Sequence, residues 1–283
     1  MLKTRILTAL LLIPAVLAAL FLLPSFGWAL ATLAVVTIAA QEWSRVTGLT
    51  VTGGRVFTGA LVVVGAALLG LAWSAPAGGW VPGVVTGVCG VAVLFWLAIA
   101  PLWVIKRWST RHTALQIAVG FVVLLATWVA LVELQARSPW LVLAAMAVVW
   151  IADTAAYFTG RAWGRHKLAP LVSPGKSWEG VYGAWVAVLL YAWLLSPLAV
   201  AAGFRGTTGV IAVVLWLLFV FVMASASVVG DLYESLMKRQ AGVKDSGTLL
   251  PGHGGILDRI DALLAAMPLA ALATQWFLVP SGA

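Results

Sequence analysis

Charged residues are scarce in this chain. Asp, Glu, Lys and Arg make up 9% of its 283 residues, whereas soluble domains carry about 25%. Hydrophobic residues make up 63%, and a soluble fold could not remove so much apolar surface from water. The apolar runs are long and continuous rather than short and alternating, which excludes a transmembrane β-barrel. The composition therefore predicts an all-α, polytopic integral membrane protein.

Cysteine and acidic residues are also few. Cys89 is the single cysteine and lies in an apolar run, which excludes a disulfide framework and a cysteine-based metal site. Nine acidic residues stand against 17 basic ones, for a formal charge of +8. Because the basic residues lie in short loops between apolar runs, they indicate membrane topology, anionic headgroups and phosphate-bearing substrates rather than nucleic acid.

The long apolar runs predict about nine transmembrane helices, since one span needs about 20 apolar residues. The N-terminal run is interpreted as a retained first span, because no convincing small-residue cleavage site precedes a soluble region. The predicted spans are 5–23, 26–41, 56–75, 84–104, 114–133, 140–159, 181–202, 208–229 and 262–280. We divide the chain into N-terminal transmembrane helices (1–135) and C-terminal catalytic transmembrane helices with cytoplasmic motif loops (136–283).

The distribution of positive charge predicts the orientation of these spans. With the N-terminus inside, 15 of the 17 Lys and Arg residues fall in inner segments, and only Arg137 and Arg205 fall in outer ones. Eight or ten spans would scramble this division. We therefore expect the N-terminus inside and the C-terminus outside.

The charge that the chain does carry is concentrated between Gly230 and Asp261. Five of the nine acidic residues lie in these 32 positions, together with four basic residues and His253. A solvated loop that only set topology would need Lys and Arg, but it would not need five acids. So much charge next to apolar spans indicates a functional site.

Carboxylates, cations and glycines alternate along this segment. Asp231, Glu234 and Lys238 are spaced by three and four, so they share one face if the helix continues past the membrane. Asp258 and Asp261 lie one turn apart, and the glycine-rich stretch before them allows close approach of backbone to a ligand. Such a set is typical of a site for a hard divalent metal and phosphate, because Mg²⁺ takes one or two carboxylates and fills its shell with water and phosphate oxygens.

A second motif, SPGKSWEG (173–180), precedes the seventh predicted span. Its Ser173, Lys176 and Ser177 beside glycine resemble phosphate-handling chemistry, but the Walker A spacing is absent. A helix-capping serine and a snorkelling lysine explain the same residues, and the motif alone leaves both interpretations open.

Three acidic residues lie elsewhere in the spans. Asp153 falls within the sixth predicted span, where an ionisable residue is a candidate functional group. An interfacial aspartate paired with Arg161 or Lys167 is the alternative, and the sequence leaves both open. Glu42 and Glu133 lie at span ends, where we expect them to face water.

The stretch from Ser235 to Asp261, SLMKRQAGVKDSGTLLPGHGGILDRID, resembles the signature of the CDP-diacylglycerol synthase (phosphatidate cytidylyltransferase) family. The segments 152–170 and 173–180 are similar to other typical segments of that family. The match is detailed over roughly the C-terminal half, whereas the N-terminal half matches only as apolar spans.

The resemblance implies a phospholipid-biosynthetic transferase of the bacterial cytoplasmic (inner) membrane, and the orientation predicted from the positive charges puts its active site on the cytoplasmic face. CTP and phosphatidic acid would give CDP-diacylglycerol and pyrophosphate, and membrane lipids would surround the site. It also implies Mg²⁺ held by Asp231 and Asp258, room for a second cation, and the homodimers common in the family.

We assign roles to the motif residues on this basis. Asp231, Asp258, Lys238 and Lys176 are expected to be catalytic, and Asp261 to bind the metal or orient its ligands. His253 is expected to shape the nucleotide pocket rather than act as a base, because a phosphatidate oxygen is already ionised. The residues expected to bind substrate are Ser173, Ser177, Arg239, Lys244, Asp245, His253, Gly254, Gly255 and Arg259.

Two other functions of polytopic membrane proteins fit this sequence less well. A CDP-alcohol phosphotransferase would carry the aspartate cluster Asp-Gly-x2-Ala-Arg, which is missing here. An ion-coupled transporter using Asp153 would show matching halves with broken helices, whereas the polar residues here lie on one face and in the C-terminal half.

Overall fold

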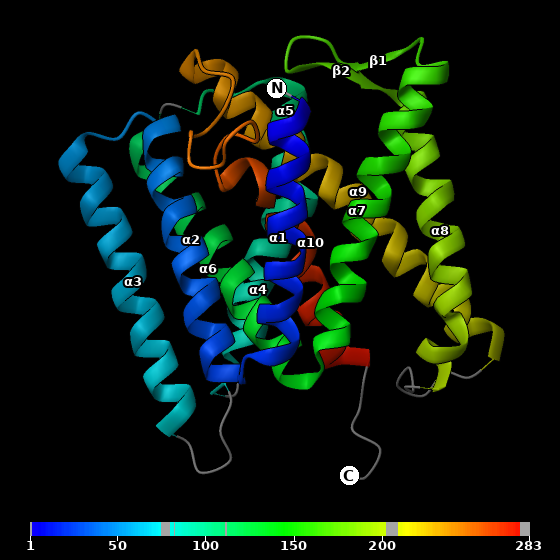
Figure 1. Cartoon of the computed structure of the whole chain (residues 1–283), viewed down its shortest axis with the longest axis horizontal. Helices are drawn as coiled ribbons and strands as arrows, with labels where there is room; N and C mark the ends of the chain where they lie inside the picture. Colours follow the sequence, from blue (N-terminus) through cyan, green and yellow to red (C-terminus); the bar gives the residue numbers. More distant parts are fainter. Residues whose placement is uncertain (1, 75–79, 82, 111, 202–208, 278–283) are drawn as a thin grey trace.

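The computed structural model describes residues 2–74, 80–81, 83–110, 112–201 and 209–277, and these are almost entirely helical (Figure 1). The helices are α1 (Leu2–Leu22), α2 (Ser25–Val46), α3 (Val51–Ser74), α4 (Val84–Leu94), α5 (Ala100–Lys106), α6 (Thr113–Arg137), α7 (Pro139–Trp163), α8 (Trp178–Ala201), α9 (Gly209–Ala241) and α10 (Leu257–Phe277). A π-helical turn, Phe95–Ile99, joins α4 to α5. The all-α prediction holds except for a small antiparallel hairpin of β1 (Lys167–Ala169) and β2 (Ser173–Ser177).

Seven helices in the described part of the chain are long and apolar enough to cross a membrane. They are Ser25–Val46, Val51–Ser74, Val84–Lys106, Thr113–Arg137, Pro139–Trp163, Trp178–Leu198 and Gly209–Ala241, and they coincide with the second to eighth predicted spans. Helices α1 and α10 occupy the first and ninth positions, but α10 carries three charges in its first five residues. The count of nine therefore stays a prediction. Arg205 and the end of the ninth predicted span lie outside the described residues.

Helix boundaries in the bundle follow local chemistry. Pro24 precedes α2 in extended conformation, which breaks the first apolar stretch into two helices. Ser138 begins α7 by accepting a hydrogen bond from the Trp140 amide at 3.3 Å, and Pro139 occupies the first turn, where its missing N–H costs nothing.

Helix α10 lies inside the bundle and is buried from Ala262 to Ala271, with α4, α6, α7 and α9 among its neighbours. In Figure 1, α3 and α8 lie at opposite edges of the molecule. One hydrophobic core includes residues from both halves of the sequence. The division into 1–135 and 136–283 thus stays a prediction.

Helix α9 is longer than a membrane crossing requires and runs obliquely through the bundle (Figure 1). Its 33 residues span roughly 50 Å, against about 30 Å for the hydrocarbon core. Its acidic and basic residues all lie in the last third, from Asp231 to Arg239, and this third is in place to reach the membrane surface.

The hairpin, the beginning of α1 and the connection between α9 and α10 (242–256) lie at one end of the bundle, whereas α10 ends at the other (Figure 1). An odd number of crossings requires such an arrangement. That the end with the hairpin faces the cytoplasm stays a prediction.

Candidate active site

A cavity of about 860 Å³ lies at the end of the bundle that carries the hairpin. The polar side chains that line it come from α7, β2, α9, the α9–α10 connection and α10. They are Asp153, Tyr157, Arg161, Ser173, Lys176, Ser177, Asp231, Lys238, Asp245, Asp258, Arg259 and Asp261. The two sequence motifs, which lie far apart in the chain, therefore meet at one cavity.

An ion pair joins the two motifs directly. Lys176 Nζ on β2 lies 2.6 Å from Asp231 Oδ2 on α9, and both side chains are about three-quarters buried. The hairpin presents Lys176 from an anchored position, because Glu179 at the start of α8 accepts hydrogen bonds from the His166 amide and lies 2.6 Å from His166 Nδ1. Lys176 is thus not a snorkelling lysine directed to solvent.

Ser177, in contrast, caps a helix. Its Oγ accepts a hydrogen bond from the Gly180 amide at 3.2 Å, and the residue is 4% exposed. This is the N-cap position of α8, where a serine oxygen satisfies an otherwise unpaired amide. The capping interpretation of Ser177 is correct, although its hydroxyl also borders the cavity.

Asp258 lies in the first turn of α10, where four groups contact its carboxylate. Lys238 Nζ lies 2.7 Å from Oδ1, while the amides of Ser246 and Gly255 donate to Oδ2 at 2.9 and 2.8 Å and the Ser246 hydroxyl lies 3.0 Å from it. Burial alone would raise the pKa of Asp258, but Lys238 and the two amides outweigh it, and the pKa lies below its ordinary value. Asp258 is therefore a carboxylate at neutral pH.

Lys238 connects two carboxylates. Its ammonium also contacts Glu234, one helical turn earlier on α9, as the spacing of these residues predicted. Glu234 is 1% exposed, so a cation beside it is needed to keep a charge at that depth. Lys238 is consequently both a structural counterion and the cation nearest to Asp258.

Helices α9 and α10 approach closely at Gly230, next to Asp231. A Cβ atom at this position would lie 2.6 Å from the Asp261 carbonyl oxygen, which is backbone and cannot move aside easily. The absence of a side chain at Gly230 lets the two helices bring Asp231, Asp258 and Asp261 to the same cavity.

The other predicted substrate-binding residues are divided, since Arg239 and Lys244 lie outside the cavity lining whereas Ser173, Asp245 and Arg259 belong to it. Arg239 Nε donates to the Val172 carbonyl at 3.4 Å, and Lys244 is exposed outside the cavity lining. Arg259 lines the cavity and also donates from Nε and a terminal nitrogen to the His253 carbonyl. Ser173 and Asp245 line the cavity as well.

The glycine-rich stretch (251–255) forms a turn, and none of its residues belongs to the cavity lining. Gly254 has a φ of +83°, a conformation that glycine adopts without strain. Its carbonyl accepts from the Leu250 amide, and Gly255 donates to Asp258. His253 is half-buried. Gly255 thus holds Asp258, and the expected contribution of His253, Gly254 and Gly255 to a nucleotide pocket stays a prediction.

Asp153 lines the same cavity from α7. Arg161, one of the two partners expected for an interfacial aspartate, donates to the Tyr157 hydroxyl at 3.0 Å. The described ion pairs include none between Asp153 and Arg161 or Lys167. The position of Asp153 thus favours a role at the cavity.

The expectation that Glu42 and Glu133 face water is wrong. Glu133 is 9% exposed and pairs with Arg137 on its own helix at 2.6 Å. Glu42 is 3% exposed and contacts the α9–α10 connection. Sequence reasoning also missed Ser246, whose backbone and side chain both contact Asp258. A serine directly after the Lys244–Asp245 pair was the available signal.

The side chains at the cavity suit Mg²⁺ in chemical type, because carboxylate oxygens are its preferred protein ligands. Within the described residues, no group of three or more His, Cys, Asp and Glu side chains is placed to hold a metal alone. An ion here would therefore take one or two carboxylates, with substrate and water completing its shell.

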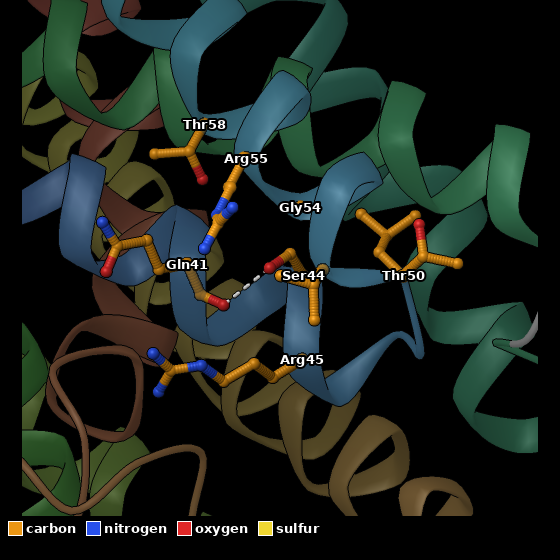
Figure 2. A pocket seen from close by; sticks show the side chains of 9 residues that line it. Gln41, Ser44, Arg45, Thr50, Gly54, Arg55 and Thr58 are labelled. Atoms are coloured by element: carbon orange, nitrogen blue, oxygen red, sulfur yellow. Dashed lines mark hydrogen bonds between the residues drawn. The ribbon is translucent and has the colours of Figure 1, made fainter.

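A separate cavity of about 480 Å³ lies between α2 and α3, and Figure 2 shows the side chains that line it. Arg45 and Arg55 line it beside Gln41 and Thr58. It contains no carboxylate and shares no lining residue with the cavity around Asp258. It therefore lacks the groups that could hold a metal beside a nucleotide.

Comparison with known proteins extends the family resemblance noted in the sequence to most of the chain. The sequence model of the cytidylyltransferase family matches residues 3–277. The phosphatidate cytidylyltransferase of Pseudomonas aeruginosa is 41% identical over 279 residues, which cover 96% of each chain. That of Haemophilus influenzae is 39% identical over 289 residues, covering 95% of this chain and 96% of that protein. The chain therefore belongs to the cytidylyltransferase family.

Proposed function

We propose that this protein is a phosphatidate cytidylyltransferase, which converts CTP and phosphatidic acid to CDP-diacylglycerol and pyrophosphate. The observation that carries the proposal is the Lys176–Asp231 ion pair, which joins the two motif segments at the cavity bordered by Asp258. The names of relatives that match nearly the whole chain support the same reaction.

The reaction forms one bond and breaks another at phosphorus. A phosphate oxygen of phosphatidate attacks the α-phosphorus of CTP, and the bond from that phosphorus to pyrophosphate breaks. The attacking oxygen is already ionised, so no general base is required. Catalysis consists mainly of bringing two anions together and stabilising the charge that develops between them.

The cations of the cavity suit this task. Lys176 and Lys238 approach from β2 and α9, and Arg259 approaches from the first turn of α10. We assign to them the neutralisation of the triphosphate and the lipid phosphate, with Ser173 donating a hydrogen bond to phosphate. Mg²⁺ held by Asp231 and Asp258 would neutralise further phosphate charge, and Asp261 lies beside them in the same lining.

The depth of the site suits a lipid substrate. Asp231 follows the start of α9 by 22 residues, or roughly 33 Å along the axis of this oblique helix, so α9 crosses most of the hydrocarbon core before it reaches Asp231. We place the cavity at the cytoplasmic surface of a bacterial inner membrane, where CTP is present. The proposal also includes a second cation and a homodimer, which rest on the family resemblance alone.

A labelled-nucleotide assay tests the proposed function. Purified protein given CTP labelled at the α-phosphate, phosphatidate and Mg²⁺ is expected to produce lipid-soluble label, together with one pyrophosphate per transfer. Omission of phosphatidate or chelation of divalent cations should abolish the product. Label that enters lipid without added phosphatidate would contradict the proposed reaction. An undiminished rate in excess chelator would contradict the metal requirement.

A further inference from the structure

The carboxylate of Glu42 reaches the catalytic region from the other half of the sequence. Glu42 lies near the end of α2 and is 3% exposed. Its carboxylate accepts hydrogen bonds from the amides of Ile256 and Leu257 at 3.1 and 2.7 Å. Because Leu257 is the first residue of α10, these amides lie at a helix start, where backbone donors have no partner within the helix. Glu42 thus caps α10 from a different helix.

Ser246 links Glu42 to Asp258. Its Oγ lies 3.1 Å from Glu42 Oε2 and 3.0 Å from Asp258 Oδ2, and its amide donates to the same Asp258 oxygen. A hydroxyl carries one hydrogen, so it donates to one of these carboxylates at a time. The two carboxylates therefore both contact the α9–α10 connection at Ser246.

Glycines in the connection allow this close approach. A Cβ atom at Gly247 would lie 2.9 Å from the Glu42 carboxyl carbon, and one at Gly255 would collide with the side chains of Glu42 and Ser246. The backbone therefore passes against the Glu42 carboxylate without intervening side chains. Glu42 therefore contacts the backbone of the connection directly, and these contacts fix the position at which α10 begins.

The end of α2 is itself firmly packed. Trp43, next to Glu42, donates from Nε1 to the Gln116 carbonyl at 3.1 Å and stacks on Tyr233 of α9. Ser44 packs against Gly54 of α3 and, with Gln41, borders the cavity in Figure 2. Glu42 is thus carried by a rigid element that contacts α3, α6 and α9.

We propose that Glu42 is a positioning residue for the reaction: it holds the α9–α10 connection and the start of α10 so that the Asp258 carboxylate is fixed at the cavity. The proposal rests on the proposed function only for the chemistry that Asp258 performs. The positioning itself is a property of the protein without substrate, and it is measured separately.

Replacement of Glu42 with glutamine tests this role while preserving side-chain size. The glutamine amide keeps one acceptor oxygen but replaces the other with an NH₂ group. That group cannot accept a hydrogen bond from the backbone amide that it would face. In the protein without metal or nucleotide, hydrogen–deuterium exchange of peptides covering 246–257 should accelerate at least about tenfold, since local opening governs exchange. CMP transfer should fall about 10- to 100-fold, the usual cost of losing a group that orients a catalytic ligand, with kcat affected and the KM for CTP nearly constant.

Gln41→Ala is the matched control, because Gln41 neighbours Glu42 on α2 but borders the other cavity. It should leave exchange and transfer at the parental values. If Glu42→Gln does not fold, Ser246→Ala, which removes the link between the carboxylates, should produce a smaller change in the same direction in both measurements.

The two readouts separate failure of this inference from failure of the proposed function. Parental exchange at 246–257 in folded Glu42→Gln protein, or in Ser246→Ala protein where Glu42→Gln does not fold, would overturn the positioning role whatever the activity. Loss of activity that only parallels a lower melting temperature would also overturn it. A parental protein without CMP transfer would refute the proposed function while leaving the exchange result interpretable.

Discussion

Replacing Asp258 with asparagine is expected to lower CMP transfer by about 100- to 1,000-fold, because several kcal/mol of charge stabilisation is lost at about 1.4 kcal/mol per tenfold in rate. The change removes the negative charge that would hold a metal and that now pairs with Lys238. The amide oxygen can take the place of Oδ2, which accepts from the amides of both Ser246 and Gly255, so the connection from Ser246 to Gly255 should stay close to its present position. Initial rates at saturating CTP and Mg²⁺ measure the effect.

Glu133→Gln is the matched control for this substitution. Glu133 is also a largely buried carboxylate with a cationic partner, Arg137, but it lies outside the cavity lining. Its neutralisation should leave transfer within about threefold of the parental rate, after correction for the amount of folded protein, as expected for a substitution remote from the reacting atoms. A rate near the parental value in Asp258→Asn, with this control also active, would remove Asp258 from the mechanism.

Replacing Lys238 with methionine is expected to abolish measurable transfer and also to destabilise the protein. The ammonium contacts both Glu234 and Asp258, and its side chain is 13% exposed. Removing one partner from a buried ionic cluster typically costs about 3–5 kcal/mol, because the remaining charge is left uncompensated. A lower melting temperature in detergent, together with the loss of transfer, measures both effects.

A second substitution separates the structural effect from the catalytic one. In Lys238→Met/Glu234→Gln the buried Glu234 carboxyl, which would otherwise be left without its cation, is replaced as well, so part of the lost stability should return. Transfer should remain absent, because the cation beside Asp258 is still missing. Recovery of transfer along with stability would show that Lys238 acts only as a counterion for Glu234.

The position of the candidate site could be predicted from the sequence because charged residues are rare in the rest of the chain. Few charges occur in the chain, so the cluster from Asp231 to Asp261 stands out against the apolar spans. Helical spacing also predicted that Glu234 and Lys238 share one face of the helix, where they form an ion pair. These features are local in sequence, and local rules are sufficient for them.

Long-range contacts could not be predicted in this way. Glu42 resembles any acidic residue at a span end, and only folding brings it to Ile256 and Leu257. The Lys176–Asp231 pair likewise joins segments that no periodicity relates. The hairpin of β1 and β2 was missed because its strands have three and five residues, too few for a clear alternating pattern.

A structure of the protein with Mg²⁺ and a non-hydrolysable CTP analogue tests the central claim most directly. The expected result is a metal ion with carboxylate oxygens of Asp231 and Asp258 at about 2.1 Å, the distance that Mg²⁺ demands, and phosphate oxygens of the nucleotide completing its shell. A nucleotide bound outside the cavity shared by β2, α9 and α10, or a metal bound without either aspartate, would contradict the account.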